Sequence, residues 1–200
     1  MGSILVVCTG NVCRSPIAEG MLRSILQTRF GDAAPSVASA GTAGWVGSAA
    51  DPSSIAAAAE LGIDISAHRA RQLQADDVRS ADLVLAMASE HRETAARSAP
   101  EAGGAAFALK ELVRLLEALP AASSADDPSA TLAGRVREAD RLRRDRIGDW
   151  TQQEGVEDPL GMRLDGFRDV ARDLDAWCAR LADGLFGRAP ARTAAVTEGD

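Results

Sequence analysis

SILVVCTGNVCRSP, residues 3–16, decides the fold that we expect for this chain. Its apolar start, residues 3–7, predicts a buried strand. Residues 16 to about 29 predict a helix, because apolar side chains recur on one helix face: Ile17, Met21, Leu22, Ile25 and Leu26. Residues 8–15 therefore join the carboxyl end of a strand to the first turn of a helix. In a parallel sheet anions bind at this place, because free backbone N–H groups and the positive end of the helix dipole meet there.

Short apolar runs alternate with helical patterns over the first 115 residues. Three more strands are predicted, at 35–41, 81–87 and 105–109. Two more helices are predicted, one of them capped by Asp51, at 52–61 and 90–99. Strands separated by helices imply right-handed crossovers within a parallel sheet. We therefore expect one α/β domain with a four-stranded, mainly parallel, Rossmann-like sheet and helices on both faces.

The chain changes character between residues 117 and 150, which we interpret as an insertion in the domain. Residues 118–130 predict a loop, because Ala, Ser, Asp and Pro dominate them. Residues 134–150 predict a heavily charged helix whose face is solvated.

The last part of the chain predicts one more helix and a tail. Residues 165–185 carry apolar side chains at helical spacing, and Cys178 among them is expected to fill the core rather than to react. Residues 188–200 show no periodicity and are expected to be disordered. The domain is thus expected to span residues 1–187.

Composition argues against several kinds of partner. The 200 residues carry a net charge of −7, which disfavours a general affinity for nucleic acid or for an anionic membrane surface. Three cysteines in a chain of this length fit a reducing compartment better than a disulfide framework. The N-terminus has no basic leader and its apolar run is too short for a signal peptide or a spanning helix, which predicts a cytoplasmic protein. The oligomeric state is not indicated by the sequence.

The loop carries the groups that nucleophilic attack on a phosphate requires. Gly10 allows a tight turn and Asn11 tolerates left-handed backbone dihedrals, so the loop is suited to close around an anion. A positive surrounding favours the thiolate of Cys8, which is its nucleophilic form. Arg14 offers a fork of N–H donors to two phosphate oxygens, and the Ser15 hydroxyl is placed to donate to the thiolate.

One cysteine alone would equally suit a buried structural thiol at a strand end. The joint pattern is more specific: a strand, Cys8, five residues, Arg14, Ser15, Pro16 and a helix. We therefore interpret residues 8–15 as a reactive phosphate loop.

Residues 7–16, VCTGNVCRSP, resemble the phosphate loop of the low-molecular-weight protein tyrosine phosphatases. The resemblance continues in order through SAGT (39–42), WVG (45–47), ADP (50–52), GIDI (62–65), HRARQL (68–73) and ADLVLAM (81–87). It covers residues 3–115 and 155–185. The resemblance implies the α/β fold of that family and a phosphatase that acts on phosphorylated proteins or small phosphate esters without a metal or other cofactor.

The resemblance also implies roles for matching positions. Cys8 is the nucleophile that forms a phosphocysteine intermediate, Arg14 binds the phosphate, and Asp158, in Glu157-Asp158-Pro159, is the general acid and base. An acid is needed because an unprotonated alkoxide or phenolate leaves slowly. The rest of the loop is implied to bind phosphate as well: Thr9, Gly10, Asn11, Val12, Cys13 and Ser15.

Further matching positions are implied to support the loop. Asn11, Ser15, Ser39 and His68 resemble a hydrogen-bond network that holds the loop in shape. Nothing near His68 resembles a metal cluster, so a supporting role also agrees with its surroundings.

Positions around the loop are implied to contact the substrate or to guard the nucleophile. Trp45 and Leu160 are implied to border the substrate cleft, although Trp45 would also suit a half-buried surface position. Cys13 is either a neighbouring thiol that forms a protective disulfide with Cys8 or a simple buried thiol.

Three other functions share such a loop. A phosphoarginine phosphatase of the same fold favours Thr after the loop Asn, where this chain has Val12. A thioredoxin-linked arsenate reductase needs two further cysteines in the middle of the chain, and here only Cys178 remains. A non-catalytic phosphate-binding module would have no need of Cys8, Arg14 and Asp158 together.

The acid segment departs from the family pattern. The family often continues with aromatic residues after Asp-Pro, whereas this chain has Leu160, Gly161 and Met162 and no tyrosine at all. The sequence therefore indicates phosphatase chemistry more firmly than a preference for phosphotyrosine.

Overall fold

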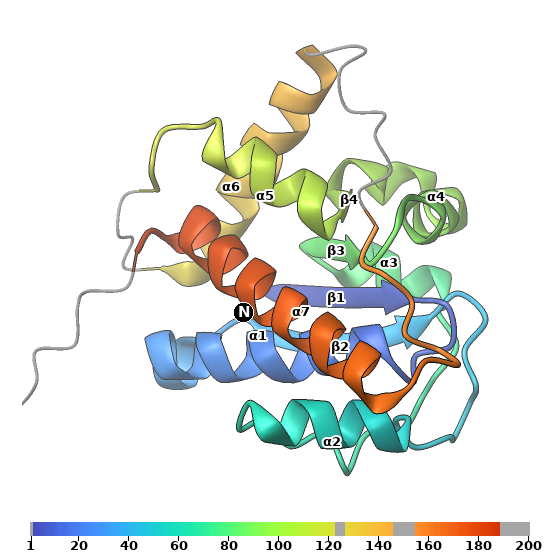
Figure 1. Ribbon diagram of the computed structural model, residues 1–200. Coiled ribbons are helices and arrows are strands. Elements are labelled where there is room, and N and C mark those ends of the chain that lie inside the picture. The colour runs from blue at the N-terminus through green and yellow to red at the C-terminus, as the bar shows by residue number, and fades with distance from the viewer. Residues whose placement is uncertain (1, 123–126, 146–154, 189–200) are drawn as a thin grey trace, which may run out of the picture.

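Four parallel strands form the central sheet in the order β2-β1-β3-β4 (Figure 1). The computed structural model describes residues 2–122, 127–145 and 155–188. The strands are β1 (Ser3–Cys8), β2 (Ser36–Gly41), β3 (Leu83–Ala86) and β4 (Ala106–Ala108). This arrangement confirms the predicted α/β class and the four-stranded parallel sheet.

Helices follow the strands along the chain. They are α1 (Arg14–Phe30), α2 (Pro52–Glu60), α3 (Ala75–Ser80), α4 (Ser89–Ser98), α5 (Leu109–Glu117), α6 (Pro128–Asp145) and α7 (Leu164–Phe186), with 3-10 turns η1 (Gly31–Ala33) and η2 (Pro100–Ala105). As expected, Asp51 caps α2, because its Oδ1 accepts the backbone N–H of Ser53 at 2.8 Å.

The two faces of the sheet are covered by different helices. Ile4 and Val6 point into a core shared with α1, α5 and α7, whereas Leu5 and Val7 point to the opposite face, toward α3 and α4. This division follows from the two-residue period of a strand, which sends alternate side chains to opposite faces. Figure 1 shows α1 and α7 passing in front of β1 and β2.

Two helices were absent from the sequence prediction. The predicted fourth strand, 105–109, is wrong at its end, because Leu109 begins α5 directly after β4. Five of the nine residues of α5 are buried, on one side of the helix: Leu109, Leu112, Val113, Leu115 and Leu116. The other missed helix, α3, has only six residues and buries Val78 alone.

The charged helix predicted at 134–150 is α6, which begins at Pro128. The predicted loop at 118–130 is therefore wrong at its end, and its residues 123–126 lie outside the described part of the chain, as do 146–150 of the predicted helix. The expectation of a solvated face needs correction too. Leu132, Val136 and Ala139 form a buried stripe among the charges, because residues three and four apart share a helix face.

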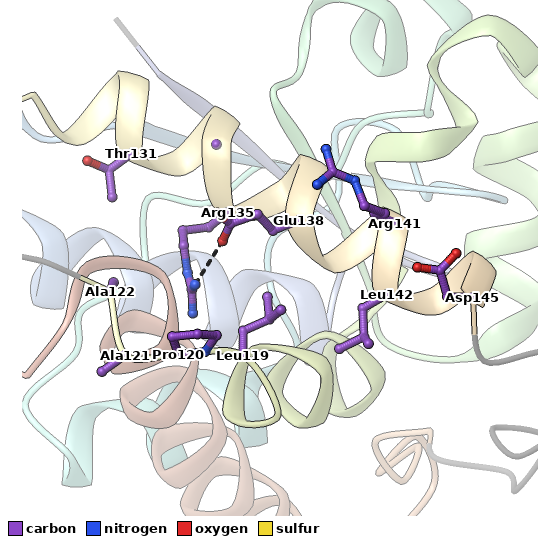
Figure 2. Close-up of a pocket in the computed structure, with 11 residues that line it drawn as sticks. Leu119, Pro120, Ala121, Ala122, Thr131, Arg135, Glu138, Arg141, Leu142 and Asp145 are labelled. Atoms are coloured by element: carbon purple, nitrogen blue, oxygen red, sulfur yellow. Dashed lines mark hydrogen bonds and ion pairs between the residues drawn. The ribbon is translucent and has the colours of Figure 1, made fainter.

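Arg135 is also buried in α6, against the same expectation. Its guanidinium donates to the carbonyl of Gly184 at 3.1 Å and pairs with Glu138 at 2.9 Å. Beside this pair, a hollow of about 600 Å³ lies between α6 and the chain that follows α5, from Leu119 to Ala122 (Figure 2). The hollow contains no residue of the phosphate loop.

The start of α6 lies at the amino end of the sheet. The backbone N–H of Gly2, which precedes β1, donates to Ser129 Oγ at 2.6 Å. Cys8 lies at the other end of β1, so the start of α6 is on the edge of the sheet away from the phosphate loop. The predicted disorder of the tail concerns residues 189–200, which lie outside the described residues.

None of the helices in the described ranges combines the length and the apolar character needed to cross a membrane.

Candidate active site

The predicted phosphate loop, residues 8–15, lies at the carboxyl edge of the sheet, where the order of the strands changes direction. From β1 the chain crosses to β2 on one side, and β3 and β4 lie on the other side. At such a switch point the loops after neighbouring strands leave a crevice. Its two borders here are the loop after β1 and the start of α4 after β3, at the right-hand end of β1 in Figure 1.

The carbonyl groups of the loop accept hydrogen bonds from neighbouring segments of the chain. Those of residues 8–10 accept backbone N–H groups from the segment 42–45 at 2.9–3.0 Å, and that of Val12 accepts the N–H of Asp51 at 2.8 Å. Within the described ranges, no acceptor bonds the N–H groups of residues 10–13. With the carbonyls turned outward, the loop and the first turn of α1 form a concave set of donors suited to an anion.

Asn11 is the central support of this loop. Its φ of 58° lies in the left-handed region, which asparagine tolerates better than most residues. Its Nδ2 donates to Ser15 Oγ at 2.9 Å and to Ser39 Oγ at 2.8 Å, and its Oδ1 accepts the backbone N–H of Arg71 at 2.9 Å. His68 Nε2 bonds the Asn11 carbonyl at 2.8 Å. The structure thus brings together the four residues expected to support the loop.

Cys8 lies at the floor of the concavity. Its side chain is buried, and its Sγ lies 2.9 Å from Ser15 Oγ. Because Asn11 Nδ2 already donates to that oxygen, the Ser15 hydroxyl hydrogen is free to point at the sulfur. The Ser15 hydroxyl is therefore a donor that the Cys8 sulfur can accept from.

Arg14 connects the loop to the segment that carries Asp158. Its Nη2 donates to Asp158 Oδ2 at 2.6 Å, and its Nη1 donates to the carbonyl of Val156 at 3.2 Å. The Arg14 side chain is buried, and across the described residues its Nε has no partner. Asp158 is 45% exposed, and its other oxygen, Oδ1, accepts the backbone N–H of Leu160 at 3.2 Å.

The cavity above Cys8 is narrow. It measures about 70 Å³ and is bordered by the loop, Arg14, Asp158, Trp45 and Leu160. A space of this size suits a small group such as a phosphoryl group, whereas a whole phosphotyrosine side chain needs more room. Trp45 and Leu160 are 51% and 50% exposed, and both contribute to the wall of the cavity. A ring attached to the phosphoryl group would therefore lie at the mouth, between these two side chains.

The other two cysteines lie in different surroundings. Cys13 is buried beside the loop, and burial followed by the nearby Asp51 carboxylate raises its pKa from 9.0 to about 12. Cys178 is fully buried within α7, where burial raises the pKa of its thiol as well. All three cysteines are free thiols. Cys178 packs in the core as expected.

Sequence reasoning missed Glu19, Val156 and His91. Glu19 accepts the hydroxyl of Ser39, and the carbonyl of Val156 accepts from Arg14. Neither residue belongs to a pattern that a single sequence reveals. The position of His91 just after a parallel strand was the one signal that could have placed it near the site.

His91 contacts the phosphate loop through Thr9. It is 2% exposed, and its Nε2 lies 2.8 Å from Thr9 Oγ1. Burial, followed by the charge of Arg14, lowers the pKa of His91 below its ordinary value of 6.5. Over the described ranges, the His, Cys, Asp and Glu residues form no group of three that could hold a metal ion.

Comparisons with known proteins agree on one family. A family model described as low molecular weight phosphotyrosine protein phosphatase matches residues 3–129. "Probable low molecular weight protein-tyrosine-phosphatase EpsP" of Ralstonia solanacearum is 46% identical over 180 residues, which cover 90% of this chain and 95% of that protein.

Solved structures show the same fold. The crystal structure of the tyrosine phosphatase AmsI of Erwinia amylovora aligns with a TM-score of 0.66 at 28% identity, over 92% of this chain and 93% of that one. The YwlE arginine phosphatase of Geobacillus stearothermophilus aligns equally well, with a TM-score of 0.66 at 29% identity over the same shares of the two chains.

Proposed function

The chain belongs to the low molecular weight protein-tyrosine phosphatase family, and we propose that it hydrolyses phosphomonoesters through a phosphocysteine intermediate on Cys8. One observation carries this proposal. Cys8, Arg14 and Asp158 border one small cavity together with loop residues whose N–H groups have no acceptor among the described residues. A nucleophile, an anion cradle and a proton donor thus surround a space of phosphoryl size.

In the first step the Cys8 thiolate attacks phosphorus. The sulfur–phosphorus bond forms as the bond from phosphorus to the leaving oxygen breaks, and Asp158 gives its proton to that oxygen. The loop N–H groups and Arg14 stabilise the charge on the three remaining phosphoryl oxygens. The unpartnered, buried Nε of Arg14 is a donor available for this purpose.

Phosphate binding also prepares Asp158 for its role. Arg14 pairs with Asp158 at 2.6 Å, and a phosphate dianion competes with Asp158 for the same guanidinium. Competition for this guanidinium releases the Asp158 side chain toward the leaving oxygen.

In the second step water attacks the phosphocysteine. Asp158, now a carboxylate, takes a proton from the water as the new oxygen–phosphorus bond forms. The sulfur–phosphorus bond breaks, and the sulfur leaves as a thiolate that the Ser15 hydroxyl stabilises. Inorganic phosphate is released and Cys8 is ready for another cycle.

The shape of the mouth favours an aryl phosphate, and phosphotyrosine in a protein is the substrate class that we propose. Trp45 and Leu160 offer two exposed apolar surfaces at the cavity, where the leaving group of a bound phosphomonoester is expected. An aromatic ring between them gains stacking and apolar contact, which a serine side chain does not.

Phosphoarginine is the second candidate, because the arginine phosphatase of Geobacillus stearothermophilus is as similar in structure as the tyrosine phosphatase of Erwinia amylovora. A guanidinium would also bind favourably over the Trp45 ring. Val12, however, stands where the arginine phosphatases favour threonine.

A rate comparison separates the candidates. Peptides of one sequence that carry phosphotyrosine, phosphoarginine or phosphoserine are supplied to the wild type and to Cys8→Ser. We expect the largest kcat/KM for phosphotyrosine and no turnover by Cys8→Ser. A larger kcat/KM for phosphoarginine would make phosphoarginine, rather than phosphotyrosine, the substrate class. Equal rates for wild type and Cys8→Ser would contradict the enzymatic proposal and favour a phosphate-binding module.

Residues 1–187 are proposed to form the catalytic domain, with 117–150 as an insertion. The start of α6 at the opposite edge of the sheet supports this division. We place the reaction in the cytoplasm, since three unpaired thiols suit a reducing compartment.

A further inference from the structure

Thr9 and His91 form a pair that the proposed reaction does not use. Thr9 follows the nucleophile in the loop, is exposed, and lines the cavity above Cys8. His91 lies in the first turn of α4 and is buried. The two side chains meet at 2.8 Å, between Thr9 Oγ1 and His91 Nε2. The pair thus connects the two borders of the crevice.

The surroundings of His91 decide which atom carries its proton. Its burial favours a neutral ring, which has one N–H group and one lone pair. Its Nδ1 is buried, and no described residue bonds it. A buried N–H without an acceptor is rarer in proteins than an acceptor without a donor. The proton therefore lies on Nε2, and His91 donates to Thr9 Oγ1.

This direction leaves the hydrogen of the Thr9 hydroxyl free. The oxygen of Thr9 accepts from His91 on its buried side, so its own O–H points away from the ring. Thr9 lines the cavity that Cys8, Arg14 and Asp158 also border. Its hydroxyl is thus one more donor close to the space where the phosphoryl group is expected.

We propose that the Thr9 hydroxyl donates to an oxygen of the bound phosphoryl group and that His91 is the positioning residue that orients this hydroxyl. The proposal rests on the proposed function, because it requires a phosphoryl group above Cys8. It adds a side-chain donor to the backbone donors of the loop. A hydrogen bond to a charged oxygen strengthens anion binding by about tenfold or more.

The test measures the Kd of inorganic phosphate by isothermal titration calorimetry, which needs no turnover. Thr9→Val keeps the branched shape and removes the hydroxyl, and His91→Leu removes the donor behind it. We expect each to raise the Kd by about tenfold. The double variant should bind no more weakly than Thr9→Val alone, because His91 acts only through Thr9.

Conservative variants separate positioning from a structural role. Thr9→Ser keeps a hydroxyl and His91→Gln keeps a side-chain N–H, so both are expected to retain a Kd within about threefold of the wild type. The matched control is Glu93→Gln, an exposed position on α4 that pairs with Arg97. If His91→Leu does not fold, Thr9→Val and Thr9→Ser still decide the matter.

The outcomes are distinct from those of the proposed function. A Kd for Thr9→Val equal to that of the wild type would overturn the inference even if the wild type hydrolyses phosphotyrosine. Additive losses in the double variant would overturn the role of His91. Conversely, a tenfold loss for Thr9→Val in a protein without turnover would support the binding inference while the catalytic proposal failed.

Discussion

Arg14 Nη2 lies 2.6 Å from Asp158 Oδ2, so the proposed phosphate-binding residue and the proposed acid are directly paired. Residues 144 positions apart in the sequence meet in this contact. Arg14 also bonds the carbonyl of Val156, which fixes the acid segment to the first turn of α1 at a second point. One guanidinium therefore serves both the anion site and the placement of the acid.

Arg14→Lys tests this double use. Lysine keeps the positive charge but loses the planar fork, so it cannot reach Val156, Asp158 and the phosphate together. We expect kcat/KM for an aryl phosphate to fall by about a hundredfold or more. Arg97→Lys on the exposed side of α4 is the control and should match the wild type. A loss of less than about threefold for Arg14→Lys would mean that charge alone suffices.

Asp158→Asn removes the proton donor while keeping the shape of the side chain. We expect kcat to fall by about a hundredfold on a phosphotyrosine peptide. The loss should be smaller on an activated aryl phosphate, whose leaving group needs little protonation. The neighbouring exposed carboxylate offers a matched control, since Glu157→Gln should leave both rates unchanged. Equal losses for the two variants would place the acid elsewhere.

Asn11→Asp tests the support of the loop. Aspartate also tolerates the left-handed backbone and still accepts the N–H of Arg71, but it has no donor for Ser15 and Ser39. We expect the free energy of unfolding, from urea titration, to fall by about 2 kcal/mol. The same chemical change at an exposed position of α1, Gln27→Glu, should alter it little. A stability equal to the wild type would contradict the assigned network.

The three thiols should react at different rates. Burial raises the pKa of Cys13 to about 12, and Cys178 is fully buried, so neither offers an accessible thiolate at neutral pH. Brief treatment of the folded protein with iodoacetamide should therefore alkylate Cys8 alone, as peptide mass spectrometry would detect. Cys8→Ser should stay unmodified under the same conditions. If Cys13 were alkylated as fast as Cys8, the assignment of Cys13 as an inert thiol would be wrong.

His91 should make stability depend on pH. Burial lowers its pKa in the folded protein below 6.5, so in acid the unfolded chain binds a proton that the folded chain resists. Its contribution to stability is present above pH 6.5 and is lost as the pH falls toward the folded pKa. The Tm of the wild type should drop more than that of His91→Gln between about pH 7.5 and about pH 5.5. Parallel Tm curves would show that burial does not perturb His91.

The local parts of the site could be predicted from the sequence. Cys8, Arg14 and Ser15 belong to one loop and one helix turn, so their spacing alone brings them together. Asp158 could be assigned only through its resemblance to a family, because no local rule links it to a loop 144 residues away. His91 reaches the loop, and Glu19 reaches the supporting residue Ser39, through tertiary packing, which periodicity does not encode.

The misjudged elements have a similar explanation. α5 was missed because Leu109 begins a helix directly after β4, without the turn residues that usually separate the two. The charges of α6 concealed its buried stripe of Leu132, Val136 and Ala139. A burial pattern carried by so few apolar residues is visible only once α5 and α7 are in place beside it.

The central claim is that a phosphoryl group is transferred to Cys8. Asp158→Asn is mixed with dinitrophenyl phosphate, whose leaving group departs without an acid, and quenched with acid during turnover. Because the second step still lacks its base, the intermediate should accumulate, and mass spectrometry should find one phosphoryl group on the peptide that contains Cys8. Continued turnover with no phosphoryl group on Cys8 would contradict the account.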